Sequence, residues 1–387
     1  MVKDKAQLNS VCENFINHVR NFYDIPGLAV GVYCGDLNEK AGAESEAEED
    51  SLVEFVGILG YRNYITKEPV MDDTVFHCTS VSKLFTAAGI MILVDSGKLK
   101  LDAKLSEILP WLSIADKRWE KITIGHMLCH TSGLADVTDY CWGNHEIDEE
   151  SPRIYALSPE VSERKLLWDP SEGKFRYSNL AYNLLGLVIA EVSGKTFEDF
   201  MTDEIFGPLG MNDSSFKTYE RTSGSLTLEA IDKASLAMPH SKGKDRTITL
   251  EQDFPYSRPH APSSTLTSTA GDLLKWARAC MGDSADLPQG AALHETSANL
   301  HGIMDAMWQE KAMVPDTGEK MGLGWFIREI AGPDKIYTLM GHEGSDDGFR
   351  TSFWICPQEK IGIALLCNLT DAPLKKLSNK LFKMLID

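Results

Sequence analysis

The chain has 387 residues, of which 43% are hydrophobic and 25% charged, and its formal charge at pH 7 is −19. This length and composition are typical of a soluble globular protein with two domains or one large insertion. The acidic excess argues against nucleic acid or an anionic membrane as a partner. The sequence also contains no run of 18 uncharged apolar residues, the length needed to span a membrane.

Residues 1–19 carry apolar side chains at helical spacing instead of the continuous apolar core of a signal peptide, which predicts a cytoplasmic protein. The eight cysteines are scattered, and none of them forms a Cys-x-x-Cys pair or a Cys/His cluster with the spacing of a zinc site. We therefore expect reduced, buried thiols, and neither a metal nor another cofactor.

Two β-rich runs, residues 26–35 and 53–63, follow the N-terminal helix. Residues 74–78 are expected to form a short buried strand, and the apolar residues after Ser80 continue nearly all round a helix, which is typical of a buried helix. Helices and long loops are expected from about residue 114 to 258. The final third predicts a helix capped by Ser268 or Thr269, then four strands, and a last helix at residues 373–386. The four strands are expected at residues 322–330, 336–344, 349–357 and 360–368.

Strands near both ends of the chain and helices between them predict an α+β fold. We expect one antiparallel sheet, flanked by the N- and C-terminal helices and assembled from residues 1–113 and 259–387, with residues 114–258 as an inserted, mainly helical domain. Small-molecule sites usually form in clefts between such units. The start of the helix at Ser80 should line that cleft.

Ser80 and Lys83 lie three residues apart at the start of the apolar helix. Side chains at i and i+3 share a helix face, so the amine would lie close enough to deprotonate the hydroxyl. Serine needs such a base because its hydroxyl is a weak nucleophile at neutral pH, and burial lowers the pKa of a lysine toward that task. The structural alternative is a helix-capping serine followed by a lysine whose amine reaches water.

The spacing itself is not distinctive, because Ser-x-x-Lys occurs four more times in the chain. A lysine buried without a role costs several kcal/mol, and only Lys83 lies within an apolar helix. The other pairs lie in polar or Gly-rich segments: Ser162/Lys165, Ser171/Lys174, Ser214/Lys217 and Ser241/Lys244.

Three further stretches attract attention. Tyr177 and Asn179 stand immediately before an expected helix, although Asn179 could be a simple helix cap. Residues 341–349, GHEGSDDGF, predict a polar turn too long for a plain hairpin. Residues 130–134, HTSGL, are expected to be a structural helix end.

Four stretches of the chain, at 76–87, 177–179, 322–325 and 342–344, resemble the successive motifs of the penicillin-recognising serine hydrolases, which include class C β-lactamases, D,D-carboxypeptidases, D-aminopeptidases and β-lactamase-like esterases. The resemblance covers nearly the whole chain in the family's motif order. Its four stretches are FHCTSVSKLFTA at 76–87, YSN at 177–179, GLGW at 322–325 and HEG at 342–344.

The resemblance implies a role for each matching residue. Ser80 corresponds to the acylated nucleophile, Lys83 to the amine that shares its proton, and Tyr177 to a second base, acting as a phenolate or as a pair with Lys83. Substrate would be bound by Asn179, His342, Gly344 and Ser345, with Asn179 on the acyl side and the backbone N–H groups of Ser80 and Ser345 forming the oxyanion hole.

The third motif departs from many β-lactamases, which carry Lys-Thr-Gly where this chain has His-Glu-Gly. Members with His first are commonly carboxypeptidases, D-aminopeptidases or esterases, and Glu343 would repel a substrate carboxylate if it faced the cleft. The resemblance thus implies a cytoplasmic serine hydrolase that cleaves small esters or amides through an acyl-serine. The alternatives are a β-lactamase or D,D-carboxypeptidase, which the lack of an export signal disfavours, an acyltransferase, and a non-catalytic binding or scaffold protein.

Overall fold

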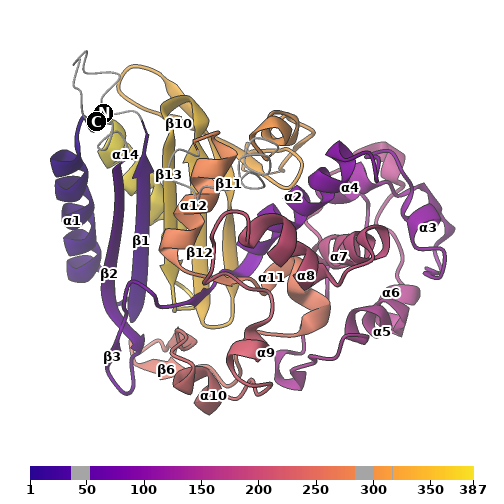
Figure 1. Ribbon diagram of the computed structural model, residues 1–387, viewed down its shortest axis with the longest axis horizontal. Coiled ribbons are helices and arrows are strands. Elements are labelled where there is room, and N and C mark those ends of the chain that lie inside the picture. The colour runs from indigo at the N-terminus through magenta and orange to yellow at the C-terminus, as the bar shows by residue number, and fades with distance from the viewer. Residues whose placement is uncertain (36–52, 284–299, 316) are drawn as a thin grey trace.

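The computed structural model describes residues 1–35, 53–283, 300–315 and 317–387. Figure 1 shows a layered sheet region on one side and a mainly helical region on the other. Within the described residues, nine antiparallel strands form the main sheet in the order β3-β2-β1-β13-β12-β11-β10-β9-β8. Their bounds are β1 Gly27–Cys34, β2 Val53–Asn63, β3 Glu68–Pro69, β8 Ala312–Met313, β9 Lys320–Met321, β10 Phe326–Ala331, β11 Ile336–Asp346, β12 Phe349–Cys356 and β13 Ile361–Cys367.

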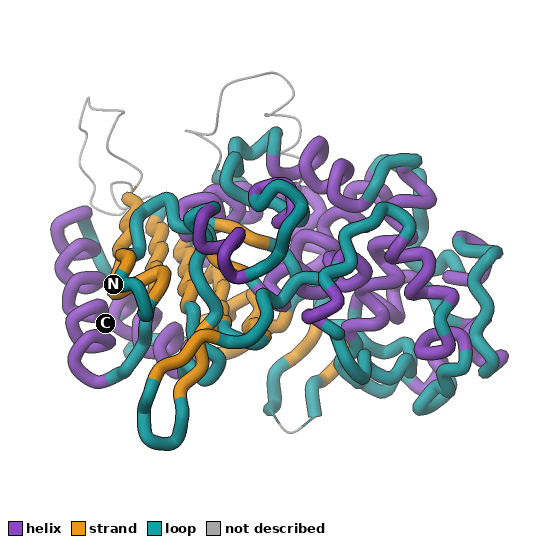
Figure 2. Tube along the Cα trace, turned by 90° about the horizontal axis from the view of Figure 1, so that it is seen from below, coloured by secondary structure: helices purple, strands orange, loops and turns teal. Residues whose placement is uncertain are grey.

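The sheet joins the two ends of the chain, because β1 pairs with β13 as well as with β2. Helices α1 (Lys5–Phe22) and α14 (Leu374–Ile386) touch each other and cover one face, and α12 (Ala270–Cys280) covers the other (Figures 1 and 2). Burial on both faces explains why β1 and β13 are continuous apolar runs. The predicted α+β architecture, with one antiparallel sheet and helices from both termini, is confirmed. The domain boundaries stay a prediction.

The helical region is built around α2 (Ser82–Asp95), whose residues are buried almost without interruption, as its apolar sequence predicts. Helices α7 (Asn179–Ser193), α8 (Phe197–Met201) and α11 (Ala261–Ser264) pack against it. Shorter elements complete the described structure: α3 Leu105–Ile108, α4 Ile124–Leu128, α5 Ser151–Leu157, α6 Pro159–Ser162, α9 Thr218–Arg221, α10 Leu228–Lys233, and the strand pairs β4 Phe76–His77 with β7 Thr267–Ser268 and β5 His240–Lys242 with β6 Ile248–Leu250.

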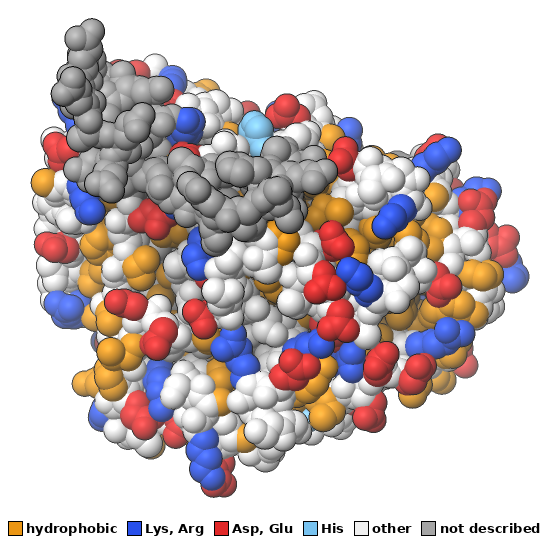
Figure 3. Space-filling model, in the orientation of Figure 1, with side chains coloured by type: hydrophobic (Ala, Val, Ile, Leu, Met, Phe, Trp, Pro, Cys, Tyr) orange, Lys and Arg blue, Asp and Glu red, His pale blue; other side chains and the backbone are white. Residues whose placement is uncertain are grey.

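All eight cysteines are free thiols, and every one except Cys141 is buried. In the described ranges no helix is long and apolar enough to cross a bilayer. Across the same ranges, no group of three or more His, Cys, Asp or Glu side chains is arranged to hold a metal ion. On the face shown in Figure 3, acidic and basic side chains are interspersed.

Candidate active site

Ser80 lies in a single turn of 3₁₀ helix, η2 (Thr79–Val81), and α2 begins only at Ser82. Thr79 has a φ of 50°, which β-branched residues rarely adopt. The Ser82 hydroxyl braces this turn, because it donates to the Thr79 carbonyl at 2.6 Å and accepts from the Leu266 backbone N–H at 3.0 Å. The strained turn thus places Ser80 at the N-terminal end of the buried helix.

Lys83 is the immediate partner of Ser80. Its Nζ donates to Ser80 Oγ at 3.0 Å and to the backbone carbonyl of Ser263 at 2.6 Å. The side chain is fully buried, so the alternative of an amine that reaches water is wrong. Burial lowers the pKa of Lys83 to about 7, although the carboxylates of Asp136 and Asp346 act in the opposite direction. A large fraction of the amine is therefore uncharged at neutral pH and able to accept a proton.

Tyr177 completes the group around the hydroxyl. Its ring centroid lies 5.0 Å from Lys83 Nζ, and Tyr177 and Ser80 line the same cavity. Burial raises the pKa of Tyr177, and the nearby Ser80 hydroxyl lowers it by less. The phenol is therefore neutral at pH 7, which argues against the phenolate that the sequence left open as a base.

His130 supports the ring of Tyr177, a role that the sequence analysis missed. The ring centroids of His130 and Tyr177 lie 4.4 Å apart, and the ring centroid of Tyr182 lies 5.0 Å from that of His130. His130 Nδ1 accepts the backbone N–H of Ser178 at 3.2 Å, which ties it to the segment that carries Tyr177. Burial lowers the pKa of His130, so the imidazole is neutral. The HTSGL stretch is a structural turn, as expected, but one that positions a candidate catalytic side chain.

Asn179 is the first residue of α7 and not its cap. Ser178 is the N-cap, since its hydroxyl accepts from Ala181 N–H at 3.2 Å. Asn179 instead contacts Asp136: its backbone N–H donates to Oδ1 at 2.7 Å, and its Nδ2 lies 3.1 Å from both carboxylate oxygens. The structure thus brings a carboxylate from a distant loop to the side chain that was expected to bind the acyl group.

The predicted long turn at 341–349 is wrong. Strand β11 continues to Asp346, and β12 starts at Phe349, so only Asp347 and Gly348 form the turn. Gly348 adopts a φ of 80°, a conformation that glycine reaches without strain and that lets the chain reverse in two residues. The glycines and charged residues before it belong to the strand.

This extended strand brings the third motif to Ser80. A Cβ on Gly344 would lie 1.6 Å from Oγ1 of Thr79 and 2.9 Å from the Ser80 backbone nitrogen, so only glycine allows this approach. Strand β10 pairs with β11 no further than Gly341, which leaves the edge of residues 342–346 open. Ser345 pairs with Arg350 next to the turn-flanking pair, and because pairing alternates, its N–H is expected to point toward that open edge.

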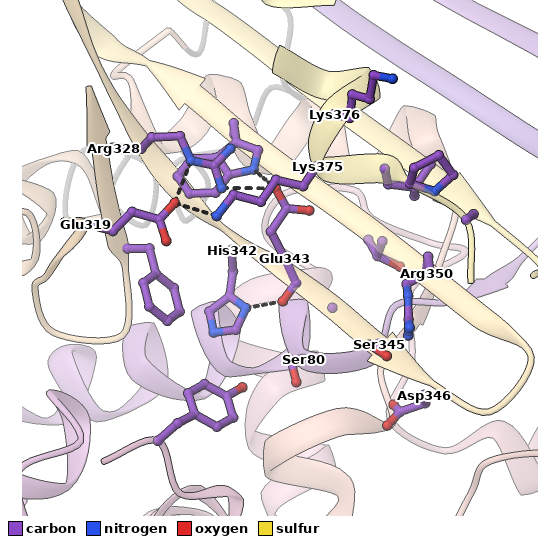
Figure 4. Close-up of a pocket in the computed structure, with 18 of the residues that line it drawn as sticks. Ser80, Glu319, Arg328, His342, Glu343, Ser345, Asp346, Arg350, Lys375 and Lys376 are labelled. Carbon is purple, nitrogen blue, oxygen red and sulfur yellow. Dashed lines mark hydrogen bonds and ion pairs between the residues drawn. The ribbon is translucent and has the colours of Figure 1, made fainter. Parts of the chain in front are cut away.

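His342 lies on the same strand, with its ring centroid 6.0 Å from that of Tyr177. Its Nδ1 donates to the carbonyl of Glu343 (Figure 4), so in the neutral ring Nε2 is an acceptor, and no described residue donates to it. Burial lowers the pKa of His342 to about 3. The imidazole is therefore neutral at pH 7 and supplies no positive charge.

Glu343 is part of a charge network and not an isolated acid. Its Oε1 accepts from Trp354 Nε1 at 2.8 Å and from Arg328 Nη2 at 3.2 Å. Arg328 also pairs with Glu319, which in turn accepts from Lys375 (Figure 4). The negative charge of Glu343 is thus compensated, and the expected repulsion of a substrate carboxylate is reduced.

One cavity of about 970 Å³ unites these groups. Figure 4 shows Ser80 at one side of it and Lys375 and Lys376 at the other. Of the residues expected from the sequence, Ser80, Tyr177, Asn179, His342, Gly344 and Ser345 line it, and Lys83 reaches it through its hydrogen bond to Ser80. The GLGW stretch at 322–325 does not line this cavity. It packs beside α2, where the Gly324 N–H donates to the Leu128 carbonyl at 3.1 Å.

Comparison with known families agrees with this geometry. The family model described as Beta-lactamase matches residues 15–382. The chain belongs to the β-lactamase family. Membership of this family supports a serine hydrolase that acts through an acyl-enzyme.

Curated relatives include penicillin-binding protein 4 of Amycolatopsis lactamdurans, 28% identical over 90% of this chain and 82% of that protein. Penicillin-binding protein 4* of Bacillus subtilis is 34% identical over 45% of this chain. Protein flp of Staphylococcus aureus is 22% identical over 85% of it. The chain spans only 36% and 59% of the length of the latter two proteins.

Two solved structures share the fold. The octameric penicillin-binding protein homologue from Pyrococcus abyssi has a TM-score of 0.73 at 24% identity, over 98% of this chain and 77% of that one. A class C β-lactamase has a TM-score of 0.71 at 17% identity, over 98% of this chain and 96% of that one. At these identities the likeness shows the β-lactamase fold alone.

Proposed function

We propose that this protein hydrolyses small esters or amides through an acyl intermediate on Ser80, with Lys83 as the base. The observation that carries this proposal is the 3.0 Å contact between Ser80 Oγ and a fully buried amine whose pKa burial lowers to about 7. A lysine held in this state costs stability, and base catalysis gives a reason for that cost.

The chemistry follows from this arrangement. As Ser80 Oγ attacks the carbonyl carbon, the neutral Lys83 amine accepts the hydroxyl proton, and the neutral phenol of Tyr177 relays a proton to the leaving group. The backbone N–H groups of Ser80 and Ser345 stabilise the oxyanion. Water then attacks the acyl-enzyme, its proton passes to the same amine, and Ser80 Oγ is reprotonated as the carboxylic acid leaves.

Turnover of nitrophenyl esters tests the proposal directly. Hydrolysis distinguishes an enzyme from a binding or scaffold protein, and product analysis with an added alcohol distinguishes a hydrolase from an acyltransferase. A panel of esters, D-amino-acid amides and a chromogenic cephalosporin then ranks the substrate classes. Absence of both turnover and acylation across the panel would contradict the proposal.

The rate should depend on pH through Lys83. Because only the unprotonated amine accepts the Ser80 proton, kcat/KM for a neutral ester should rise about tenfold per pH unit below pH 7 and level off above it. His342 and His130 do not titrate in this range, because burial lowers the pKa of each. A pH profile checks this, and a rate that keeps rising to pH 10 would point instead to a Tyr177 phenolate.

A second candidate function, action on carboxylate-bearing substrates such as β-lactams or D-amino-acid-terminated peptides, is favoured by one observation. Arg350 and Lys376 line the same cavity, and Nη1 of Arg350 has no hydrogen-bond partner among the described residues. Against it stands the neutral His342, which replaces a permanent cation next to the reaction centre.

Replacing His342 by lysine should separate the two candidates. The new cation should raise kcat/KM for a cephalosporin relative to a neutral nitrophenyl ester by about fivefold, the effect of roughly 1 kcal/mol from one charge pair in a partly wet site. Steady-state kinetics with both substrates measures the ratio, and His342→Gln, which adds no charge, is the control. If the wild type already prefers cephalosporins, or if the ratio stays unchanged, the proposed ester preference fails.

A further inference from the structure

The contact between Asp136 and Asn179 fixes the direction in which the Asn179 side chain can bind. A carboxylate accepts hydrogen bonds, so the end of the amide that lies 3.1 Å from both oxygens of Asp136 must be the NH₂ group. The backbone N–H of Asn179 donates to the same carboxylate at 2.7 Å, which holds Asp136 in place. The amide therefore cannot rotate by 180° without placing its oxygen against a carboxylate.

The opposite end of the amide, Oδ1, is left for a ligand. It is buried and accepts no hydrogen bond from any described residue, and Asn179 is 7% exposed and lines the cavity that contains Ser80. A buried acceptor without a partner costs free energy, which a substrate donor would recover. An acceptor on the substrate would meet the Asn179 oxygen and would be disfavoured.

The local charge points the same way. Asp136 and Asp346 both lie close enough to the reaction centre to raise the pKa of Lys83. Two positive side chains of the cavity, Lys375 and Lys376, lie away from Ser80 in Figure 4, whereas Arg350 lies nearer to it, beside Ser345 and Asp346. A donor that also carries positive charge should therefore be preferred to a neutral donor beside Asn179.

We propose that Asp136 orients the Asn179 side chain so that its Oδ1 accepts a hydrogen bond from the substrate. The site would then select acyl groups that carry a hydrogen-bond donor next to the scissile carbonyl, and it would prefer an ammonium group to a hydroxyl group as that donor. This inference rests on the proposed function, because it assigns Asn179 to the acyl side of an acyl-Ser80 intermediate. Asp136 is a positioning residue in this account, and Asn179 makes the contact with the substrate.

Two nitrophenyl esters isolate the donor. Hydroxyacetate and methoxyacetate differ little in size and reactivity, but only the first carries a donor on the α-carbon. After correction for their alkaline hydrolysis rates, kcat/KM should favour the hydroxyacetate by about tenfold or more. The glycinate ester, with an ammonium group, should exceed both. A preference for methoxyacetate, or no preference, would overturn the inference.

Variants test the cause of the preference. Asp136→Ala releases the Asn179 amide, so the ratio of kcat/KM for hydroxyacetate to that for methoxyacetate should fall toward one. Asp136→Asn keeps an acceptor for the Asn179 NH₂ group but removes the negative charge, so it should lower only the advantage of the glycinate ester. Asp139→Ala is the matched control, since Asp139 lies in the same loop but its carboxylate accepts from the backbone N–H of Cys141 instead of from Asn179. It should leave both ratios unchanged.

The outcomes separate the two proposals. If no ester acylates Ser80, the proposed function fails; if esters turn over but Asp136→Ala keeps the wild-type ratio, only the inference about Asn179 fails. Circular dichroism and labelling of Ser80 by a fluorophosphonate show whether each variant is folded. Should Asp136→Ala not fold, Asn179→Ala gives the same test, because it removes the acceptor itself and should also abolish the preference.

Discussion

Replacing Ser80 by alanine should lower kcat/KM for a nitrophenyl ester by a factor on the order of 10⁴ or more, because the variant has no nucleophile beside Lys83. The fold should survive. Alanine is smaller than serine, and the Lys83 amine keeps its 2.6 Å hydrogen bond to the carbonyl of Ser263. Steady-state kinetics and thermal unfolding measure the two effects, and the unfolding midpoint should move by no more than a few degrees.

Covalent labelling identifies the nucleophile independently of turnover. A fluorophosphonate should modify the peptide that contains Ser80, and Ser80→Ala should abolish the modification. Ser171→Ala is the matched control, because Ser171 also stands three residues before a lysine but lies on the surface with its hydroxyl bonded to Asp169. A label on Ser171, or on the serine of another Ser-x-x-Lys pair, would overturn the assignment of Ser80.

The pairing of Ser80 with Lys83 could be predicted because it depends on local spacing and on an apolar context, both visible in sequence. The apolar runs of β1 and β13 likewise predicted central strands, since burial on both faces leaves no polar positions. The start of α2 was less predictable. Thr79 has a positive φ, and its carbonyl accepts from the Ser82 hydroxyl, which in turn accepts from the Leu266 N–H; no rule for a β-branched residue anticipates this conformation.

Contacts made by distant segments could not be predicted. Asp136 lies 43 residues before Asn179, in a loop without clear periodicity, and only the folded chain brings the carboxylate to the amide. The Ser263 carbonyl that binds Lys83 is 180 residues away and, as a backbone group, leaves no signal in side-chain patterns. His130 was visible in a recognisable turn, but its contact with Tyr177 depends on how that turn packs.

The hairpin after β11 was misread for a different reason. Six residues with glycine and charge, 341–346, resemble a loop in composition, yet the structure uses them as a strand. Glycine is needed at 344 for the close approach to Thr79, and the charge of Glu343 is compensated by Arg328 on the neighbouring strand β10. A composition typical of a loop therefore belongs here to a strand, because contacts at the site override the local conformational preference of these residues.

Lys83 and Tyr177 should behave as one catalytic unit. Lys83→Met keeps the volume of the buried side chain but removes the amine, and Tyr177→Phe removes only the hydroxyl, so each should lower kcat by roughly 10³-fold. Because both groups handle the same proton, loss of either one interrupts the same path. The double variant should then be little worse than the worse single variant, and not about 10⁶-fold slower as independent effects would require.

Tyr182→Phe is the matched control for this double-mutant cycle. Tyr182 is also buried near the amine, with its ring centroid 5.6 Å from Lys83 Nζ and 5.0 Å from that of His130, but its hydroxyl donates to the Leu128 carbonyl at 2.8 Å and faces no substrate. Its loss should lower stability by about 1 kcal/mol and leave kcat within about threefold. Tyr177 and Tyr182 differ chiefly in what their hydroxyls contact, so a large fall in kcat for Tyr182→Phe would contradict a specific role of the Tyr177 hydroxyl. Multiplicative losses of kcat in the Lys83/Tyr177 cycle would contradict a shared proton path.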